Sequence, residues 1–226
     1  MKKILLFLVT IFIFTSFSNA TEKDGFLMGS IVKSKSWKIN RKKNKEIFKG
    51  DVSFKNQYYN LKSDYAEYNH KTKYWNLKGN VYCQRVFQNE TSIELNCERG
   101  VFFEEFENAS LYQGINPIKT IYNSSTGRKL FSYCEEVNIN NKTNQVNFKN
   151  NFILEAEKNY AYSDNALYNN TTGTFILSGS MPVVIGKEKG YNFALQGDTL
   201  KFHKDKNDIE VFGRAKGWAD ISNIKY

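Results

Sequence analysis

A six-residue pattern recurs along the chain, and this internal repeat limits the possible folds more than any other feature. In five copies an acid follows a small residue, and a small or apolar residue and a large apolar residue follow at alternate positions. These copies are Ser63–Tyr68, Cys97–Phe102, Cys134–Ile139, Ser163–Tyr168 and Gly197–Phe202. A sixth, weaker copy, Ser34–Ile39, has Lys35 in place of the acid. Self-similarity with a period of roughly 30 residues is typical of folds that stack one small structural unit many times.

The register of the repeat continues beyond the last residue of each copy. Nine residues later stand Phe48, Leu77, Leu111, Phe148, Leu177 and Val211. Eleven residues later stand Gly50, Gly79, Gln113, Asn150, Gly179 and Gly213, and thirteen later Val52, Val81, Ile115, Phe152, Met181 and Ala215. Apolar residues two apart predict β-strands, because alternate side chains of a strand share one face. Two strands in each copy give about 12 strands in total.

Each strand is predicted to bend where it passes the acidic position. The spacing of apolar residues changes parity between Leu61 and Ala66, and a strand changes faces only through an extra residue, such as a β-bulge. Asn-rich segments such as 69–72, 140–143 and 169–173 supply the turns. The expected fold is all-β: an antiparallel repeat stack, V-shaped and jelly-roll-like, with an apolar seam inside and open edge strands.

Two copies, residues 64–68 with 77–81 and residues 164–168 with 177–181, carry a family resemblance. Their acid-x-small-x-Tyr segment, polar turn and Leu-x-Gly-x-Val-like segment resemble the repeat of the OstA-like family of periplasmic lipopolysaccharide-transport proteins. The similarity covers about residues 29–215 and rests on six weak copies in register. The third copy departs most, with Gln113 at the glycine position and a long loop over residues 116–128.

The resemblance implies a bridge between the inner and outer membranes that shields the acyl chains of lipopolysaccharide, or of a similar anionic glycolipid. It also implies end-to-end pairing through edge strands, head to tail with further copies and with OstA-like domains of inner- and outer-membrane transport proteins. No cofactor is implied. The candidate lipid-binding residues are those at inward positions: Phe48, Val52, Leu61, Tyr68, Leu77, Val81, Phe102, Leu111, Ile139, Phe148, Phe152, Tyr168, Leu177, Phe202 and Val211. The same pattern also fits a closed core.

The N-terminus predicts export. Two lysines precede an apolar run over residues 4–17, and Ser18 and Ala20 are the small residues expected before a signal-peptidase cut after Ala20. We therefore expect a signal peptide over residues 1–20 and a single domain over 21–226, located in the periplasm. An uncleaved anchor is the alternative.

The chain is basic, with a net charge of +9, and basic residues are concentrated between Lys33 and Lys49. This cluster suits an anionic partner, or is a solvated loop in a Lys-rich chain. Because the chain is predicted to be exported, nucleic acid is excluded as the expected partner.

No arrangement of residues typical of an enzyme is found. The recurring acids Asp64, Glu98, Glu135, Asp164 and Asp198 occupy one repeat position, which favours a structural role at the bend over catalysis. His70 and His203 lack the spacing of metal ligands.

Three cysteines leave the disulfide state open. Cys83–Cys97 is the favoured pair if a bridge forms, and three free buried thiols are the other possibility. Cys97 and Cys134 share a repeat position about two strands apart, beyond disulfide reach.

Two further functions remain open at this stage. The first is an inner-membrane-anchored, LptC-like relative that hands lipid to the bridge. The second is a β-repeat adhesin or carbohydrate-binding structural protein, with a closed apolar interior.

Overall fold

The structure is a computed structural model, and it describes residues 30–57, 59–86, 92–123, 127, 129–169, 171–172, 174–188, 191–203 and 209–220. The predicted signal peptide lies outside the described residues. The described part forms β-strands joined by turns, with one short 3₁₀ helix, η1 (Arg41–Lys43). The all-β prediction is confirmed.

Eighteen β-strands make up most of the described residues. The first nine are β1 (Ile31–Lys33), β2 (Ser36–Asn40), β3 (Lys45–Lys55), β4 (Tyr59–Asn69), β5 (Tyr74–Val86), β6 (Ser92–Phe103), β7 (Asn108–Tyr112), β8 (Ile118–Asn123) and β9 (Lys129–Cys134). The others are β10 (Glu136–Asn140), β11 (Gln145–Ala156), β12 (Asn159–Asn169), β13 (Thr174–Ser178), β14 (Val183–Glu188), β15 (Tyr191–Gln196), β16 (Thr199–His203), β17 (Ile209–Phe212) and β18 (Lys216–Asp220).

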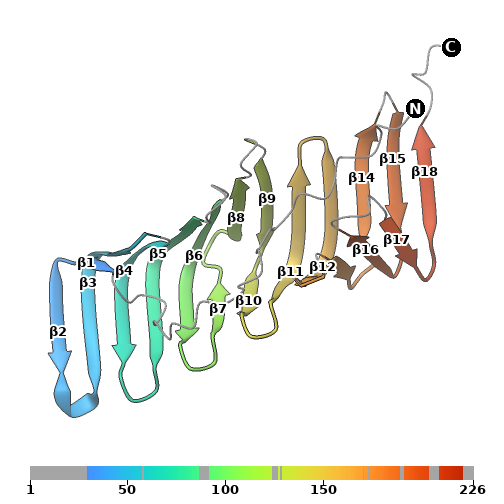
Figure 1. Cartoon of the computed structure of the whole chain (residues 1–226). Coiled ribbons are helices and arrows are strands. Elements are labelled where there is room, and N and C mark those ends of the chain that lie inside the picture. The colour runs from blue at the N-terminus through green and yellow to red at the C-terminus, as the bar shows by residue number, and fades with distance from the viewer. Residues whose placement is uncertain are drawn as a thin grey trace.

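These strands form a ladder of twelve antiparallel rungs over the described residues. The six long strands β3, β4, β5, β6, β11 and β12 are each one rung. The other six rungs are each divided between two short strands, for example β7 with β8 and β9 with β10. The rungs lie side by side in chain order from β2 at one end to β18 at the other (Figure 1). The expected number of strands therefore corresponds to the number of rungs.

Every rung contributes to two layers. The long strands bend in the middle, and each divided rung has one short strand in each layer. Layer 1 contains β2, β7, β10, β13, β16 and β17 together with one half of each long strand. Layer 2 contains β1, β8, β9, β14, β15 and β18 together with the other halves. The ladder also twists along its length: the view faces layer 1 at β2–β5 and layer 2 at β14, β15 and β18 (Figure 1). Such a twist is usual for sheets of L-amino acids.

A β-bulge lies at the bend, but its extra residue is in β3 and β5, the neighbours of the strand β4 whose change of parity predicted it. In β3 the two residues Gly50 and Asp51 lie opposite the single residue Asp64 of β4, and the register moves by one residue across this site. Both bulge residues have positive φ, 73° and 48°. The same two-against-one arrangement places Gly79 and Asn80 opposite Glu98. Across this site the inward residues are four apart in β3, Phe48 and Val52, but three apart in β4, Ser63 and Ala66, so the extra residue keeps inward residues of the two strands opposite each other in both halves.

In four of the five copies with an acid, the acid contacts a partner sixteen residues further along the chain. Asp64 Oδ2 accepts a 2.8 Å hydrogen bond from Asn80 Nδ2, and Asp164 Oδ2 accepts one of 2.6 Å from the backbone N–H of Ser180. We call these contacts bend pairs. Further bend pairs join Glu135 to Asn151 and Asp198 to Arg214. The structural interpretation of the acidic positions agrees with these contacts.

The first repeat copy has the same bend pair with its charges exchanged. Lys35 stands at the acidic position, and its Nζ lies 2.7 Å from Oδ2 of Asp51. In the third copy the partner position is Gly114, which carries no side chain, and Ile115 beside it is fully exposed. Ile118 takes the buried place that the repeat register assigned to Ile115, because β8 begins only after this loop.

The turns of layer 1 use one recurring contact. An asparagine at the end of a strand accepts a hydrogen bond through its side-chain oxygen from the backbone N–H three residues later. The four pairs are Asn40 with Lys43, Asn69 with Thr72, Asn140 with Thr143 and Asn169 with Thr172. The Asn-rich turns that the sequence predicted therefore close the rungs on this side.

We expect replacement of Gly79 by alanine to destabilise the fold. Its φ is +72°, and an added Cβ would lie 2.5 Å from Oδ2 and 3.0 Å from Cβ of Asp64. Left-handed backbone costs an L-residue about 1–2 kcal/mol, and the close approach would also disturb the bend pair. Gly127→Ala is the matched control, since Gly127 has φ +82° and nothing within 4 Å of the added Cβ. Urea unfolding should show a larger loss for Gly79→Ala, and equal losses would contradict this account of the bend.

Candidate functional site

An apolar seam runs between the two layers along the whole ladder. On layer 1 two columns of cross-strand neighbours face inward. The column near the bend is Trp37, Phe48, Ala66, Leu77, Gly100, Leu111, Val137, Phe148, Ala166, Leu177, Leu200 and Val211. The column near the turns, which we call the layer 1 rim, is Ile39, Glu46, Tyr68, Trp75, Phe102, Ala109, Ile139, Val146, Tyr168, Phe175, Phe202 and Ile209.

Layer 2 faces the seam with a similar set of residues. Its middle column is Val32, Phe54, Leu61, Cys83, Leu95, Thr120, Ser132, Leu154, Ala161, Val184, Leu195 and Gly217. The column farthest from the bend, which we call the layer 2 rim, contains Tyr59, Arg85, Ile93, Tyr122, Leu130, Ala156, Asn159, Gly186, Phe193 and Ala219. Both walls are therefore apolar at nearly every rung.

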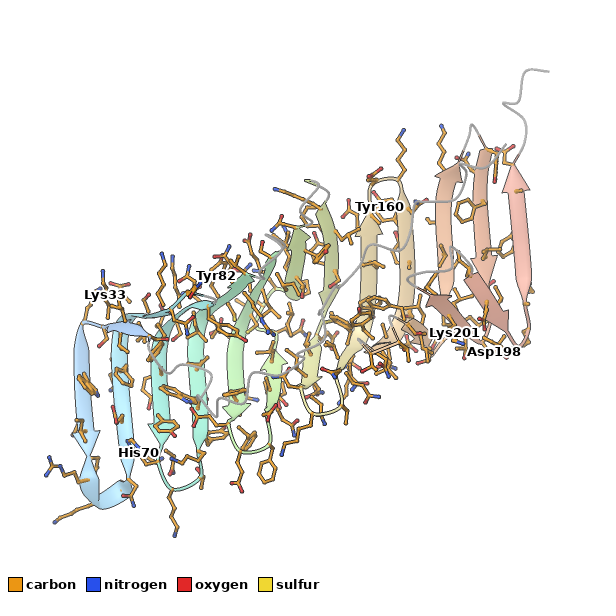
Figure 2. The ribbon with its side chains drawn as sticks, in the orientation of Figure 1. Lys33, His70, Tyr82, Tyr160, Asp198 and Lys201 are labelled. Atoms are coloured by element: carbon orange, nitrogen blue, oxygen red, sulfur yellow. The ribbon has the colours of Figure 1, made fainter. Side chains whose placement is uncertain are left out.

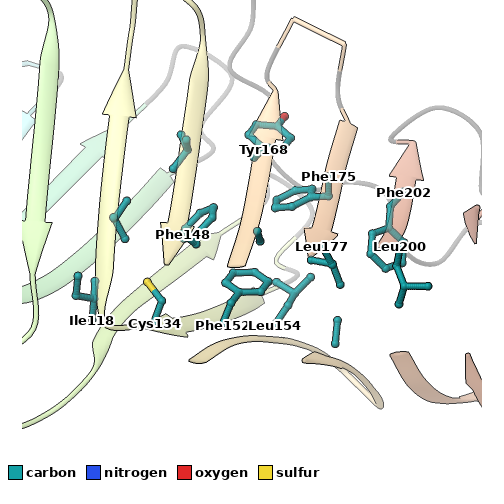
Figure 3. Close-up of a cluster of buried hydrophobic side chains, with 14 of the residues drawn as sticks. Ile118, Cys134, Phe148, Phe152, Leu154, Tyr168, Phe175, Leu177, Leu200 and Phe202 are labelled. Atoms are coloured by element: carbon teal, nitrogen blue, oxygen red, sulfur yellow. The ribbon is translucent and has the colours of Figure 1, made fainter. Parts of the chain in front are cut away.

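Side chains of the two walls touch each other in the deep part of the seam. Phe48 of layer 1 lies against Phe54 of layer 2 with ring centroids 5.4 Å apart, and Phe148 lies 5.1 Å from Phe152. Figure 3 shows Phe148, Tyr168, Phe175 and Leu177 facing Ile118, Cys134, Phe152 and Leu154 from the other layer. Burying a Phe or Leu side chain contributes about 1.5–3 kcal/mol. The seam thus also forms the hydrophobic core of the fold.

All fifteen predicted lipid-binding residues lie at inward positions of this seam. The ones that are buried are Phe48, Val52, Leu61, Leu77, Val81, Phe148, Phe152, Tyr168, Leu177 and Phe202. The half-buried ones are Tyr68, Phe102, Leu111, Ile139 and Val211. Their placement agrees with the repeat register, and whether they contact lipid stays a prediction.

Several seam residues were absent from the sequence-based set. Most come from layer 2, including Phe54, Leu95, Ile118, Leu154 and Val184, which are all buried. The available signal was the alternation of apolar residues in the strands that lead into each repeat copy. That signal is weaker, because Thr120 and Ser132 interrupt the apolar column in the middle of the ladder.

The first rungs carry an aromatic cluster with its polar atoms satisfied at the rim. Tyr68 stacks on Trp75 at 4.5 Å. Both donate to one carboxylate, Tyr68 through its hydroxyl to Glu104 Oε2 and Trp75 through Nε1 to Glu104 Oε1. Burial, together with this hydrogen bond, raises the pKa of Tyr68 to about 12, so the hydroxyl stays protonated. Glu104 therefore keeps the rings oriented toward the seam at this end.

Charged side chains lie mainly outside the seam. Lys33 and Tyr82 project from the outer face of layer 2, and His70 lies beside the turns of layer 1 (Figure 2). Lys45, from the basic cluster of the sequence, pairs with Glu67 at 2.6 Å on the outer face of layer 1. His70 Nε2 lies 2.7 Å from Glu46 Oε1. No three His, Cys, Asp or Glu side chains of the described residues lie close enough together to hold a metal ion.

The three cysteines are free thiols on the seam side of layer 2. Cys83 lies opposite Leu95 and Cys97 opposite Val81, so the two cysteines are diagonal neighbours. Cys97 and Cys134 are separated by β8, in agreement with the two-strand separation that the repeat predicted. Burial raises the pKa of Cys97 and of Cys134 to about 12, which keeps both thiols protonated at neutral pH.

Comparison with known protein families gives a match over most of the ladder. Residues 31–208 match the family described as "LptA/(LptD N-terminal domain) LPS transport protein". The chain belongs to this family. The family consists of lipopolysaccharide-transport components rather than enzymes, so lipopolysaccharide transport is the process in which the chain takes part. The predicted OstA-like relationship is thereby confirmed, and a domain of this type is exported.

Among solved structures, the chain is similar to LptH, "the LptA homologous periplasmic component of the conserved lipopolysaccharide transport device from Pseudomonas aeruginosa". The identity is 9%, the alignment covers 67% of this chain and 82% of LptH, and the TM-score is 0.27. A comparison with curated proteins finds no match. Within the described residues, no helix has the length and apolar character to cross a lipid bilayer.

We expect the seam cysteines of the lipopolysaccharide-transport domain to resist alkylation in the folded state. Cys134 is 1% exposed and has its pKa raised to about 12, whereas the thiolate is the reactive species. Because a raised pKa lowers the thiolate fraction at every pH below it, native protein at pH 8 should react with maleimide far more slowly than urea-unfolded protein. Equal labelling rates, followed by intact mass, would contradict a closed seam at Cys134.

Proposed function

We propose that the chain is a periplasmic bridge that shields the acyl chains of lipopolysaccharide while the lipid moves from the inner to the outer membrane. The observation that supports this most is the layer 1 column near the bend, which has no polar side chain at any of the twelve rungs of the described residues. A single binding pocket would need apolar residues at only a few rungs. A register that repeats at every rung suits a ligand that travels along the ladder.

The physical need for such a path is large. Transfer of an apolar chain into water costs about 0.8 kcal/mol for each methylene group, so one long acyl chain costs roughly 10 kcal/mol. An apolar wall that follows the lipid through the periplasm removes most of this barrier without any chemical step. The protein then acts by binding alone, and no catalytic group is required.

Lipid entry requires the layers to separate from their rims. The deep residues Phe48, Phe54, Phe148 and Phe152 are buried against each other. Rim residues such as Ile139 and Ile209 of layer 1, and Ile93, Leu130 and Phe193 of layer 2, are only partly buried and pack on the edge of this core. At these positions separation gives up little buried area at first, whereas buried rim residues such as Tyr168 and Phe175 make it more costly at their rungs. An acyl chain that replaces these contacts restores the apolar environment.

Export and domain limits belong to the same proposal. We expect a cut after Ala20 and a single domain over residues 21–226. The continuous ladder from β1 to β18 supports a single domain over the described residues.

The two ends of the ladder are the proposed partner surfaces. In the described part of the chain, β1 and β2 at one end, and β17 and β18 at the other, have a strand partner on one side only. Large apolar side chains are exposed at both ends, for example Trp37 at 61% and Trp218 at 53%. Unpaired strand edges recruit further strands. A second copy, or a related domain of an inner- or outer-membrane transport protein, would continue both the ladder and its seam.

Photo-crosslinking in cells tests the lipid path. A photoreactive side chain at Leu77, Phe148 or Leu177 faces the seam and should capture lipopolysaccharide. The neighbouring positions Lys78 and Lys149 face outward on the same strands and serve as matched controls that should give no adduct. Lipid adducts are detected by their shifted mass on immunoblots against lipopolysaccharide. A closed structural core would give no adduct at any inward position, and the bridge function would then be wrong.

Removal of Lys216–Tyr226 tests the C-terminal edge. The truncation deletes β18, which pairs only with β15 among the described strands, so the rest of the ladder keeps its pairing. We expect weaker self-association in sedimentation velocity, by about tenfold or more in dissociation constant, with the β-type circular dichroism spectrum retained. An unchanged dissociation constant would show that this edge does not mediate assembly.

A further inference from the structure

The outer face of layer 2 changes character along the ladder. Every second residue of its strands points away from the seam, because side chains alternate between the two faces of a strand. On the first five rungs the two outward rows are mostly polar and include four charged residues. These rows are Lys33, Ser53, Lys62, Tyr82 and Asn96 beside the bend, then Ile31, Lys55, Asn60, Gln84 and Glu94.

On five later rungs the same two rows are mainly apolar. Strands β9, β11, β12, β14 and β15 contribute ten outward residues, of which eight are apolar or aromatic. Glu155 and Gln196 are the other two. We call the eight residues the outer patch: Phe131, Tyr133, Ile153, Tyr160, Tyr162, Val183, Ile185 and Ala194.

The outer patch is continuous and accessible. Its members are neighbours on adjacent strands, and Tyr162 and Ile185 are 36% and 38% exposed. The rings of Tyr160 and Tyr162 stack with centroids 6.3 Å apart and planes within 15°. Stacked tyrosines offer a large contact area and lose little side-chain entropy on binding.

The outer face of layer 1 shows that this composition is not general. On β10, β11 and β12 its outward residues are polar or charged with one exception, Leu167. They are Glu136, Asn138, Asn140, Gln145, Asn147, Lys149, Asn165, Leu167 and Asn169. A continuous apolar patch on an otherwise polar surface marks an interaction site.

The size of the outer patch fits a protein partner. The flanking strands β8 and β18 extend its row with Ile121 and Trp218. Seven strands about 4.8 Å apart, each roughly 20 Å long, give about 600 Å² for each copy, so a symmetric pair would bury on the order of 1,200 Å². This area is the lower end of the range for specific interfaces, and aromatic residues with few charges are typical of an interface core.

The charges beside the patch favour a second copy over a lipid surface. Glu155 lies in the middle of the patch, in register with Phe131 and Tyr160. Lys119 stands on the opposite side of Phe131, with its Nζ 5.2 Å from the ring centroid. A symmetric pair brings one face against itself, so a face with both signs of charge can be self-complementary. An anionic lipid surface would instead meet the carboxylate of Glu155.

We propose that the outer patch is an interface between two copies of this chain, which lie side by side with the outer faces of layer 2 in contact. Two copies have the same twist, and twisted sheets stack face to face about 10 Å apart with interdigitated side chains. The contact lies along the side of the ladder and leaves the strand edges at both ends free. It does not depend on whether the seam carries lipid.

Paired substitutions in the full exported chain test the interface. Tyr162→Thr with Ile185→Thr removes apolar area from the patch while both residues stay β-branched. The dissociation constant for self-association in sedimentation velocity should rise by about tenfold or more, because each copy loses central contacts. Leu167→Thr with Ile176→Thr is the matched control, since these cross-strand neighbours lie on the outer face of layer 1. The control should associate like the parent, and circular dichroism checks that both variants keep their β structure.

Photo-crosslinking identifies the surface that Tyr162 contacts. Light and heavy-nitrogen-labelled copies are mixed, each with a photoreactive side chain in place of Tyr162, with and without vesicles of phosphatidylglycerol and phosphatidylethanolamine. Mixed-isotope adducts that join strands β9–β15 of one copy to the same strands of the other support the proposal. Adducts to β1 or β2 alone, or an unchanged dissociation constant in Tyr162→Thr with Ile185→Thr, leave only the ladder ends as the interface and overturn it. Adducts to phospholipid without protein adducts assign the patch to a membrane and also overturn it.

Discussion

The β-bulge at each bend is the constraint on which the rest of the structure depends. In β3, β5 and β11 two residues with positive φ, such as Gly79 and Asn80, lie opposite one acid, and this extra residue keeps the inward residues of neighbouring strands opposite each other in both layers. Without it, inward residues of neighbouring long strands would lie opposite each other in only one of the two layers. The bend pairs are exposed contacts of modest strength. Their repetition at the same position nevertheless fixes where each strand turns. The exchange of Lys35 and Asp51 preserves the contact with reversed charges, so five of the six copies carry an oppositely charged or hydrogen-bonding pair at the bend.

The same interior serves as hydrophobic core and as candidate lipid path, and these roles make different demands. A stable fold needs close packing between the layers, as in the contact of Phe48 with Phe54. A lipid path needs walls that separate without unfolding. The ladder reconciles the two demands because its backbone hydrogen bonds run within the layers and around the bend. Separation of the rims therefore breaks side-chain contacts but no strand pairing.

Polar and charged groups along the seam are few, and their positions give the ladder a direction. The first rungs hold the Tyr68–Trp75 stack with its Glu104 acceptor, and the rim of the same region holds Arg85. The later rungs are lined mainly by apolar residues such as Leu177, Leu200 and Phe202, with the buried polar Asn159 at the layer 2 rim. The inward surface therefore differs between the two ends of the described ladder.

The sequence by itself determined the repeat, the all-β class, the bends and the inward faces, because a strand has a side-chain period of two and six copies report the same register. It therefore placed residues such as Phe148 and Leu177 correctly. It could not assign Ile118 in place of Ile115, since the loop of the third copy changes where β8 begins. It also did not distinguish Arg85 from the many outward lysines, because its inward position follows from its pairing with Tyr59 and Ile93 in three dimensions. Only the tertiary structure decided that the two walls touch, since the distance between the layers depends on packing between residues far apart in sequence.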